Sequence, residues 1–358
     1  MRTHFAVAAL AAVLAVSSTA MAQTKVGGDA DINAFRPAID SRGYITVNAS
    51  QVLGHKELSF GLVTNWGKSV LTLEDGVNTY EVQNIISPPL IGAFGLKLGP
   101  AELEFGVNMP FHVMNGDRSP DSDGGTPDDP NDDLNFQFDG QGLGDIGLHM
   151  KARFLSTSKG PKVGLGVIAS VYLPTASESG KWIGEGGATP QVIGIVDKEF
   201  GESRRLRMSF NGGIRLRLNN AVFVDNQGGF PNAAPETPAT NERVEAKATL
   251  PVGFGLAYAL VPQKFDLVAE AFGAIPMGGE NWMPAEAIGG IKLYLAKNSF
   301  LSLGGGVGLI PDIAANPDIR AFLGIVFEPN IGDRDGDGLK DDVDKCPDDP
   351  EDFDDFED

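Results

Sequence analysis

The residues most able to do chemistry are the aspartates near the end of the chain. Residues 331–358 hold twelve Asp and two Glu against Arg334, Lys340 and Lys345, a net charge of −11 within a total of −20 for 358 residues. Such a block repels itself unless cations neutralise it, so we expect a metal-bound or disordered tail and no nucleic-acid partner.

Aspartates in this tail occur at every second position around glycine. Ca²⁺ takes about six to eight oxygen ligands, and a compact turn that bends at glycine can aim several carboxylates at one point. The spacing predicts a calcium site formed by Asp333, Asp335, Asp337, Asp341 and Asp344. An EF-hand is disfavoured, because Asp344 stands at the twelfth position where that loop needs Glu.

These aspartates, followed by Cys346 and Pro347, resemble the thrombospondin type 3 repeat. The resemblance implies calcium ligands at the matching aspartates, and a second half-repeat adds Asp352 and Asp354 as ligands. Disulfides link successive repeats in that family. The single cysteine of this chain is therefore expected as a free thiol, or as half of a pair whose partner lies beyond the end of this chain.

The N-terminus predicts export. Arg2 and His4 precede an apolar run over residues 5–16, and Ala20-Met21-Ala22 suits a signal peptidase. We therefore expect a signal peptide over residues 1–22, followed by a periplasmic segment over residues 23–56.

Alternation of apolar and polar residues with period two recurs over residues 57–329 and predicts β-strands of about ten residues, the length that crosses a membrane. The predicted segments are 58–66, 82–97, 101–111, 142–155, 162–173, 188–199, 204–218, 243–258, 264–275, 286–296, 299–309 and 318–328. Twelve is an even number, as single-chain bacterial barrels require. The fold class is therefore all-β, an antiparallel transmembrane β-barrel with an irregular calcium-binding tail over residues 330–358.

Connections between these segments alternate in length, which is typical of outer-membrane barrels with the short turns in the periplasm. Short turns are predicted at 99–100, 156–160, 201–203, 261–263 and 297–298, and long loops at 67–81, 115–140, 174–187, 219–242, 276–284 and 311–317. The barrel is thus expected in the cell outer membrane, in contact with lipid, with its tail in the periplasm. The 115–140 loop holds eight Asp, and divalent cations could bridge it to lipopolysaccharide.

Charged residues occupy the positions opposite the apolar ones and are predicted to line the lumen. They are Arg205, Arg207, Arg215, Arg217, Glu102, Glu104, Asp145, Lys151, Arg153, Glu245, Lys247 and Glu270. Opposite charges could neutralise one another into a plug, or could line opposite walls of a passive channel for small solutes. In an open channel the arginine row would favour anionic solutes.

The combination of a barrel, the segment Phe35–Asp40 and the acidic tail also resembles the myxobacterial-type OmpA-like proteins. There the repeats link the barrel to a domain that binds peptidoglycan, and no such domain is present in this sequence. The aromatic ending of the last segment, Phe327 with Phe322, resembles the signal that barrel assembly machinery recognises. The resemblance implies a structural or pore-forming, porin-like protein of the cell envelope.

Two other classes of protein share some of these features. A secreted β-sandwich that binds calcium and acts in adhesion would also show alternation, but usually with shorter strands. An enzyme is not expected, because the four His show no metal spacing and no nucleophile motif occurs.

Overall fold

The computed structural model describes residues 30–74, 79–99, 101–117, 138–158, 162–177, 182–201, 203–218, 221–224, 243–311 and 315–329. The predicted signal peptide and the predicted calcium ligands in the tail lie outside these residues. No helix in the described ranges is long and apolar enough to span a membrane.

Eighteen strands are formed by the described residues. They are β1 (Leu58–Glu74), β2 (Thr79–Ser87), β3 (Leu90–Leu98), β4 (Ala101–Met109), β5 (Phe111–Asn115), β6 (Gly140–Leu143), β7 (Ile146–Leu155), β8 (Val163–Leu173), β9 (Thr189–Phe200), β10 (Leu206–Arg215), β11 (Ala221–Val224), β12 (Arg243–Ala246), β13 (Thr249–Val261), β14 (Phe265–Pro276), β15 (Gly279–Glu280), β16 (Ala285–Ala296), β17 (Ser299–Gly308) and β18 (Ile319–Phe327).

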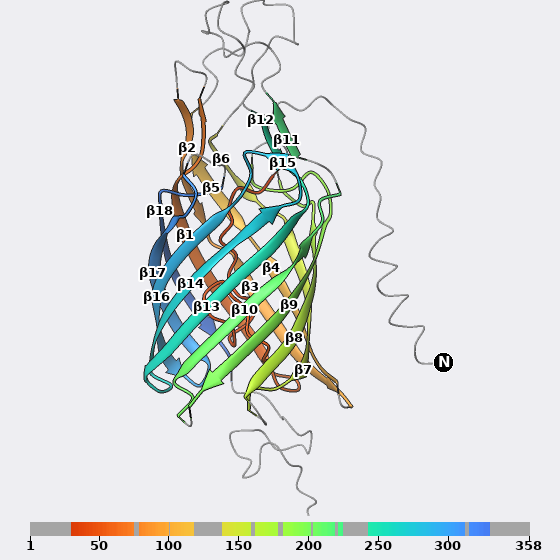
Figure 1. Ribbon diagram of the computed structural model, residues 1–358, viewed down its shortest axis with the longest axis vertical. Helices are drawn as coiled ribbons and strands as arrows, with labels where there is room; N and C mark the ends of the chain where they lie inside the picture. The colour runs from red at the N-terminus through yellow and green to blue at the C-terminus, as the bar shows by residue number, and fades with distance from the viewer. Residues whose placement is uncertain are drawn as a thin grey trace, which may run out of the picture.

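Twelve of these strands form a closed wall (Figure 1). Its order is β18, β17, β16, β14, β13, β10, β9, β8, β7, β4, β3 and β1, and β1 pairs with β18 to complete the ring. Neighbouring strands of the wall are antiparallel. The predicted twelve-stranded barrel is confirmed. The alternative of a soluble sandwich is wrong, because two packed sheets would keep free edges that this wall does not have.

Hydrogen bonding between strands is interrupted at one place, where β2 gives way to β3 and β4 gives way to β5. Leu90 of β3 faces Met109 of β4, and Ile86 of β2 faces Val113 of β5, so the two strand pairs share one register on either side of the break. Pro88, Pro89 and Pro110 occupy the gap between them, and proline has no N–H to donate to a sheet. Because these donors are missing, the predicted strand 82–97 is divided into β2 and β3, and the predicted strand 101–111 is divided into β4 and β5.

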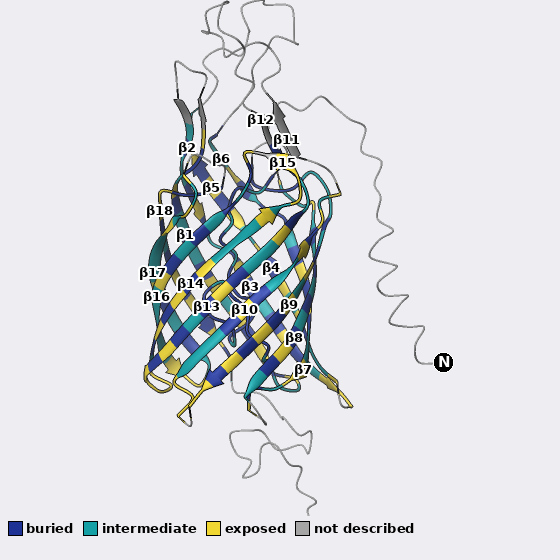
Figure 2. Cartoon of the chain, viewed as in Figure 1, coloured by how far each residue is buried: buried dark blue, intermediate teal, exposed yellow. Residues whose placement is uncertain are grey.

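The two faces of the wall differ as the alternation predicted. Large apolar side chains are exposed on the outside, among them Phe60, Phe94, Phe105, Phe210, Phe254, Leu303, Leu323 and Phe327 (Figure 2). Acidic and basic residues that alternate with them are buried inside. A continuous apolar belt of this size suits hydrocarbon rather than water.

The turn lengths also separate the two ends of the barrel. Short connections join β3 to β4, β7 to β8, β9 to β10, β13 to β14 and β16 to β17 at one end, which we call the short-turn end (Figure 1). The connections from β8 to β9, β10 to β13, β14 to β16 and β17 to β18 lie at the opposite, long-loop end. The predicted long loop at 67–81 is wrong, because β1 continues to Glu74 and pairs with β2 from Thr79 onward.

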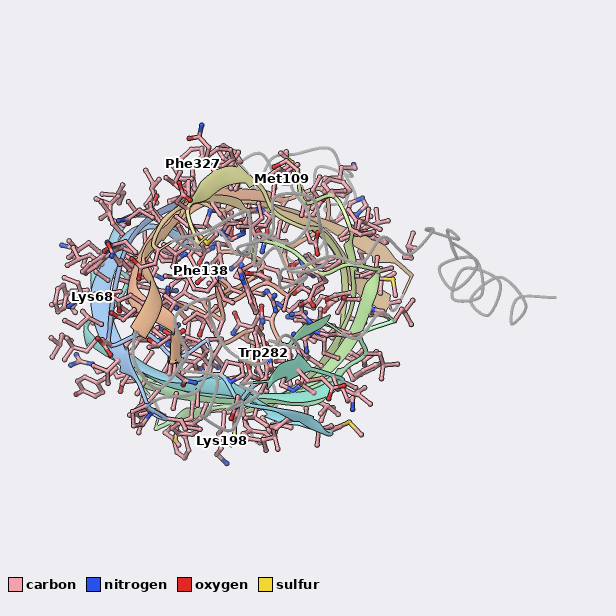
Figure 3. The ribbon with its side chains drawn as sticks, turned by 90° about the horizontal axis from the view of Figure 1, so that it is seen from above. Lys68, Met109, Phe138, Lys198, Trp282 and Phe327 are labelled. Carbon is pink, nitrogen blue, oxygen red and sulfur yellow. The ribbon has the colours of Figure 1, made fainter. Side chains whose placement is uncertain are left out.

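Residues 30–57, which we call the luminal segment, lie inside the barrel (Figure 1). The prediction of a periplasmic segment over 23–56 is corrected for this described part. Phe35, Tyr44, Ile45, Val47 and Ala49 are buried against the wall in one apolar cluster. Seen from above, side chains fill the ring of strands, with Phe138 and Trp282 on the inside and Lys198 on the outside (Figure 3). The segment avoids exposing these apolar residues to water, which a periplasmic location would require.

Candidate functional site in the barrel lumen

Carboxylates of the wall hold the irregular backbone of the luminal segment. Glu270 accepts hydrogen bonds from the backbone N–H groups of Ile45, Thr46 and Val47. The carboxylate of Asp197 accepts from the N–H and the hydroxyl of Ser50, at 2.8 and 2.6 Å.

Glu104 and Asn211 act in the same way. The carboxylate of Glu104 accepts from the N–H of Leu53 at 2.8 Å. The Asn211 amide accepts from the N–H of Asn48 at 2.8 Å and donates to its carbonyl at 2.9 Å. Buried backbone groups need such partners, and a segment without secondary structure must take them from the wall.

Buried ion pairs also connect the segment to the wall. Lys151 of β7 pairs with Asp40 of the segment, and both side chains are fully buried. Burial raises the pKa of Asp40, but the Lys151 ammonium and the hydrogen bonds to the carboxyl group together outweigh it, and the pKa lies below its ordinary value. Arg320 of β18 pairs with Glu286 and donates to Asn33 of the segment at 3.1 Å.

At the short-turn end, Arg42 of the segment pairs with Glu57 at 2.9 Å and with Glu328 at 2.8 Å. Glu328 directly follows β18 and also accepts from the Ser41 hydroxyl. Burial raises the pKa of Glu328, and the Arg42 guanidinium partly opposes that rise. The luminal segment is thus held at both ends of the barrel and in between.

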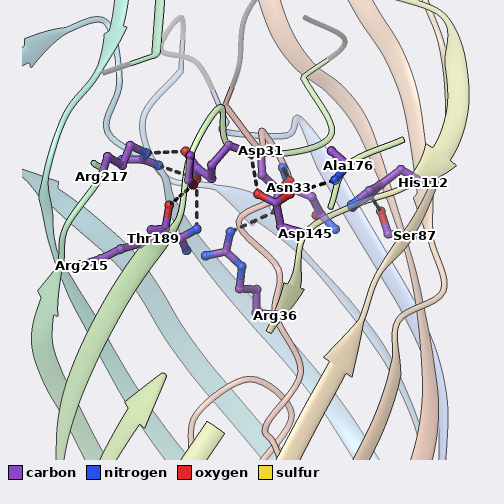
Figure 4. Close-up of polar contacts among 12 residues, drawn as sticks. Asp31, Asn33, Arg36, Ser87, His112, Asp145, Ala176, Thr189, Arg215 and Arg217 are labelled. Carbon is purple, nitrogen blue, oxygen red and sulfur yellow. Dashed lines mark hydrogen bonds and ion pairs between the residues drawn. The ribbon is translucent and has the colours of Figure 1, made fainter. Parts of the chain in front are cut away.

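A cluster of arginines lies toward the long-loop end (Figure 4). Arg215 and Arg217 both pair with Glu185, at 3.0 and 2.7 Å, and Arg36 pairs with Asp31 at 3.0 Å. The guanidinium groups of Arg36 and Arg215 both lie over the ring of Tyr172, 4.9 and 4.6 Å from its centre. Their side chains point toward one another (Figure 4).

An internal cavity of about 140 Å³ adjoins this cluster. It lies between the luminal segment and the wall from β7 to β14, and Trp282, Pro284 and Ala315 border it at the long-loop end. A smaller cavity of about 20 Å³ shares Arg36, Tyr172 and Arg215 with it and reaches Pro89 and Pro110 at the break in the wall. The site is therefore a polar internal space between wall and segment.

The structure brings several of the predicted luminal residues inward. Glu104, Asp145, Lys151, Arg215, Glu245 and Glu270 are buried. Arg217 is almost fully buried at Glu185, and Arg207 is partly buried against Asp266. Glu102 pairs with Arg153 in a partly exposed position, and Lys247 pairs with Glu245 at 2.8 Å.

Arg205 does not line the lumen, which corrects the prediction. It is exposed on the turn before β10, where the alternation of the strand no longer directs side chains. Phe322 is also inside the barrel, against Phe35 at 5.6 Å, whereas Phe327 is outside against Phe60. Only Phe327 is therefore placed as a terminal aromatic facing lipid.

Sequence reasoning missed Asp31, Arg36, Tyr172 and Glu185. Arg36 and Asp31 belong to the luminal segment and Glu185 to a loop, so no strand alternation marked them. Among the described residues, no three His, Cys, Asp or Glu side chains form a group that could hold a metal ion.

Comparisons with known proteins agree with the fold. The chain matches no protein-family model, and no curated protein is similar to it in sequence. An outer membrane channel from Pseudomonas putida F1 has a similar structure over 78% of this chain and 98% of that chain, with a TM-score of 0.54 and 14% identity. The toluene transporter TbuX from Ralstonia pickettii gives a TM-score of 0.38 at 10% identity, over 78% of this chain and 90% of that chain.

The first similarity shows a shared fold, and at 14% identity it shows nothing further. Fold and interior together define the class of this protein. It is a twelve-stranded β-barrel of the outer-membrane type, and its own luminal segment occupies the interior.

Proposed function

We propose that the protein is an outer-membrane channel for small solutes, and that the luminal segment closes it in the state described here. The observation that carries the proposal is the nature of the contacts between segment and wall. Beside the apolar cluster, they include hydrogen bonds and ion pairs to Glu104, Lys151, Asp197 and Glu270, which water can replace when the segment moves. The apolar exterior supports residence in the outer membrane.

The test is conductance of the full chain in planar bilayers, with the segment free or tethered. The side chains of Ser50 and Asp197 are in contact, so a Ser50→Cys, Asp197→Cys variant in a Cys346→Ser background places two thiols, one on the segment and one on the wall, close together for oxidation. We expect current steps with the reduced variant and their loss after oxidation. A folded protein that conducts equally in both states would refute gating by the segment. No steps in either state at any voltage would leave a structural barrel as the function.

The acidic tail is proposed to bind Ca²⁺ through Asp333, Asp335, Asp337, Asp341, Asp344, Asp352 and Asp354. It follows β18, which ends at the short-turn end, and short turns face the periplasm in outer-membrane barrels. A periplasmic tail stiffened by calcium would suit a linker, as the resemblance to OmpA-like proteins implies. Calcium neutralises carboxylates that otherwise repel one another.

Partners follow from the same proposal. The exposed apolar belt would contact lipid, and lipopolysaccharide would meet the acidic loop at the long-loop end. Phe327 at the end of β18 supports recognition by the barrel assembly machinery. Peptidoglycan would be reached only through a further domain. A catalytic activity is not proposed.

A further inference from the structure

Three of the four charged side chains on the lining of the cavity beside Tyr172 are arginines. Charged residues on its lining are Arg36, Arg215, Arg217 and Asp31. Glu185 lies behind the lining and pairs with two of the arginines, and Asp145 accepts a hydrogen bond from the Glu185 N–H at 2.6 Å in the same cluster. The side chain of Arg36 is 27% exposed although it lies inside the barrel, so part of it borders internal space.

Unsatisfied polar atoms concentrate on the same lining. Asn108, His149, Arg215 and Thr249 are 7, 6, 4 and 1% exposed, and each has a side-chain atom with no hydrogen-bond partner among the described residues. These are Asn108 Oδ1, His149 Nε2, Arg215 Nε and Thr249 Oγ1. Buried polar atoms in native proteins almost always have a partner.

Their arrangement suits an anion, because Arg215 Nε and Thr249 Oγ1 can donate hydrogen bonds. His149 Nδ1 is bonded to the Ser170 hydroxyl at 2.8 Å, so Nε2 donates when that hydroxyl donates to Nδ1. Hydrogen bonds from such donors to a charged carboxylate are stronger than bonds to neutral acceptors.

The remainder of the lining is apolar and limits the size of a ligand. It includes Ile39, Val47, Ile168, Ile193, Val252 and Phe272. A volume of about 140 Å³ is close to that of an engineered cavity of about 150 Å³ that holds benzene. The space therefore fits an acid no larger than about a single ring with one carboxylate.

We propose that this cavity binds a small organic monocarboxylate. The carboxylate lies at Arg215 and Arg36, receives the Thr249 and His149 hydrogen bonds, and directs its apolar part toward Ile168 and Phe272. Binding does not depend on conduction. The further statement that such acids pass through the barrel rests on the proposed channel function.

Calorimetric titration of the full chain in detergent tests the site. The probes are benzoate, the neutral benzamide of similar size, and inorganic phosphate. We expect benzoate to bind at least about tenfold more tightly than benzamide or phosphate, because only benzoate has both the charge and the apolar ring. Arg215→Gln should weaken benzoate binding at least about tenfold, while the exposed Arg205→Gln serves as control and leaves it unchanged.

If Arg215→Gln does not fold, as judged by heat-modifiable migration, Thr249→Val keeps the test intact. It removes only an unpartnered hydroxyl and should still weaken benzoate binding severalfold. Three outcomes overturn the assignment. The first is no heat at millimolar benzoate, which means that water alone fills the cavity. The others are equal binding of benzoate and benzamide, and equal binding of benzoate and phosphate.

Flux into protein-containing liposomes separates the two proposals. Benzoate binding without flux supports the site and contradicts the channel. Flux without saturable binding supports the channel and contradicts the site.

Discussion

Replacing Lys151 with methionine would test how the luminal segment is held. Lys151 on the wall neutralises Asp40 on the segment, and both side chains are fully buried. Glu104 lies close enough to interact electrostatically with both Lys151 and Asp40. Methionine has a similar length but no charge, so Lys151→Met leaves two acidic groups facing one another without a cation.

Breaking one side of a buried ion pair costs about 3–5 kcal/mol. Asp40 belongs to the segment, so this cost falls on the closed state alone, in which the carboxylate cannot reach water. Protonation of Asp40 or Glu104 would recover part of it. A free-energy difference of about 1.4 kcal/mol changes an equilibrium constant tenfold. The ratio of closed to open protein should therefore fall at least about a hundredfold.

Single-channel recording in planar bilayers measures that equilibrium as the ratio of open to closed time. Arg153→Met on the same strand is the matched control, because its pair with Glu102 is partly exposed and contributes at most about 1 kcal/mol. Adding Asp40→Leu to Lys151→Met should restore closing, since an apolar pair can replace a buried ion pair at little cost. A folded Lys151→Met protein that opens no more often than Arg153→Met would show that this ion pair does not hold the segment closed.

The remaining predictions concern contacts along the segment and the tail. Gly95→Ala should loosen residues 53–57, because a methyl group there would lie 2.1 Å from the Gly54 carbonyl oxygen. Gly289→Ala is the control, since its methyl group would meet nothing closer than 4.0 Å. Limited proteolysis compares the two variants, and equal protection would contradict the packing. Glu270→Gln should speed hydrogen exchange at Ile45–Val47 about 5- to 150-fold, since removing a charged acceptor costs about 1–3 kcal/mol; unchanged exchange would show that these bonds do not hold the segment. Asp335→Ala with Asp337→Ala should weaken calcium binding at least about tenfold by calorimetry, and an unaltered titration would disprove the site.

The wall could be predicted because each strand repeats one rule. Leu148 and Met150 are exposed while His149 and Lys151 are buried, as a period of two requires. The rule failed where a strand stopped. In the sequence, Arg205 continues the alternation of β10. It precedes the first residue of that strand, Leu206, so it is exposed on a turn.

The luminal segment could not be predicted by the same rule. Its backbone binds to wall carboxylates instead of to a neighbouring strand, so Ile45 and Ser50 need no alternation around them. A carboxylate that faces the lumen has the same sequence pattern whether it contacts water or a peptide N–H. The burial of Glu104, Asp197 and Glu270 therefore depends on a segment far away in the sequence.

The connectivity of the segment limits how the proposed channel can open. Glu57 precedes β1 directly, so the segment cannot leave at the short-turn end without unpairing Leu58 and Phe60 from β3 and β18. The part near Asp31 does not continue into a wall strand, and it is held by side-chain pairs such as Asn33 with Arg320, by apolar burial of Ile32 and by one backbone bond from Ile32 to Trp182. Displacement should therefore begin at the long-loop end. The cavity beside Tyr172 would be the first space to widen, which would place the proposed anion site at the entrance of the route that opening creates.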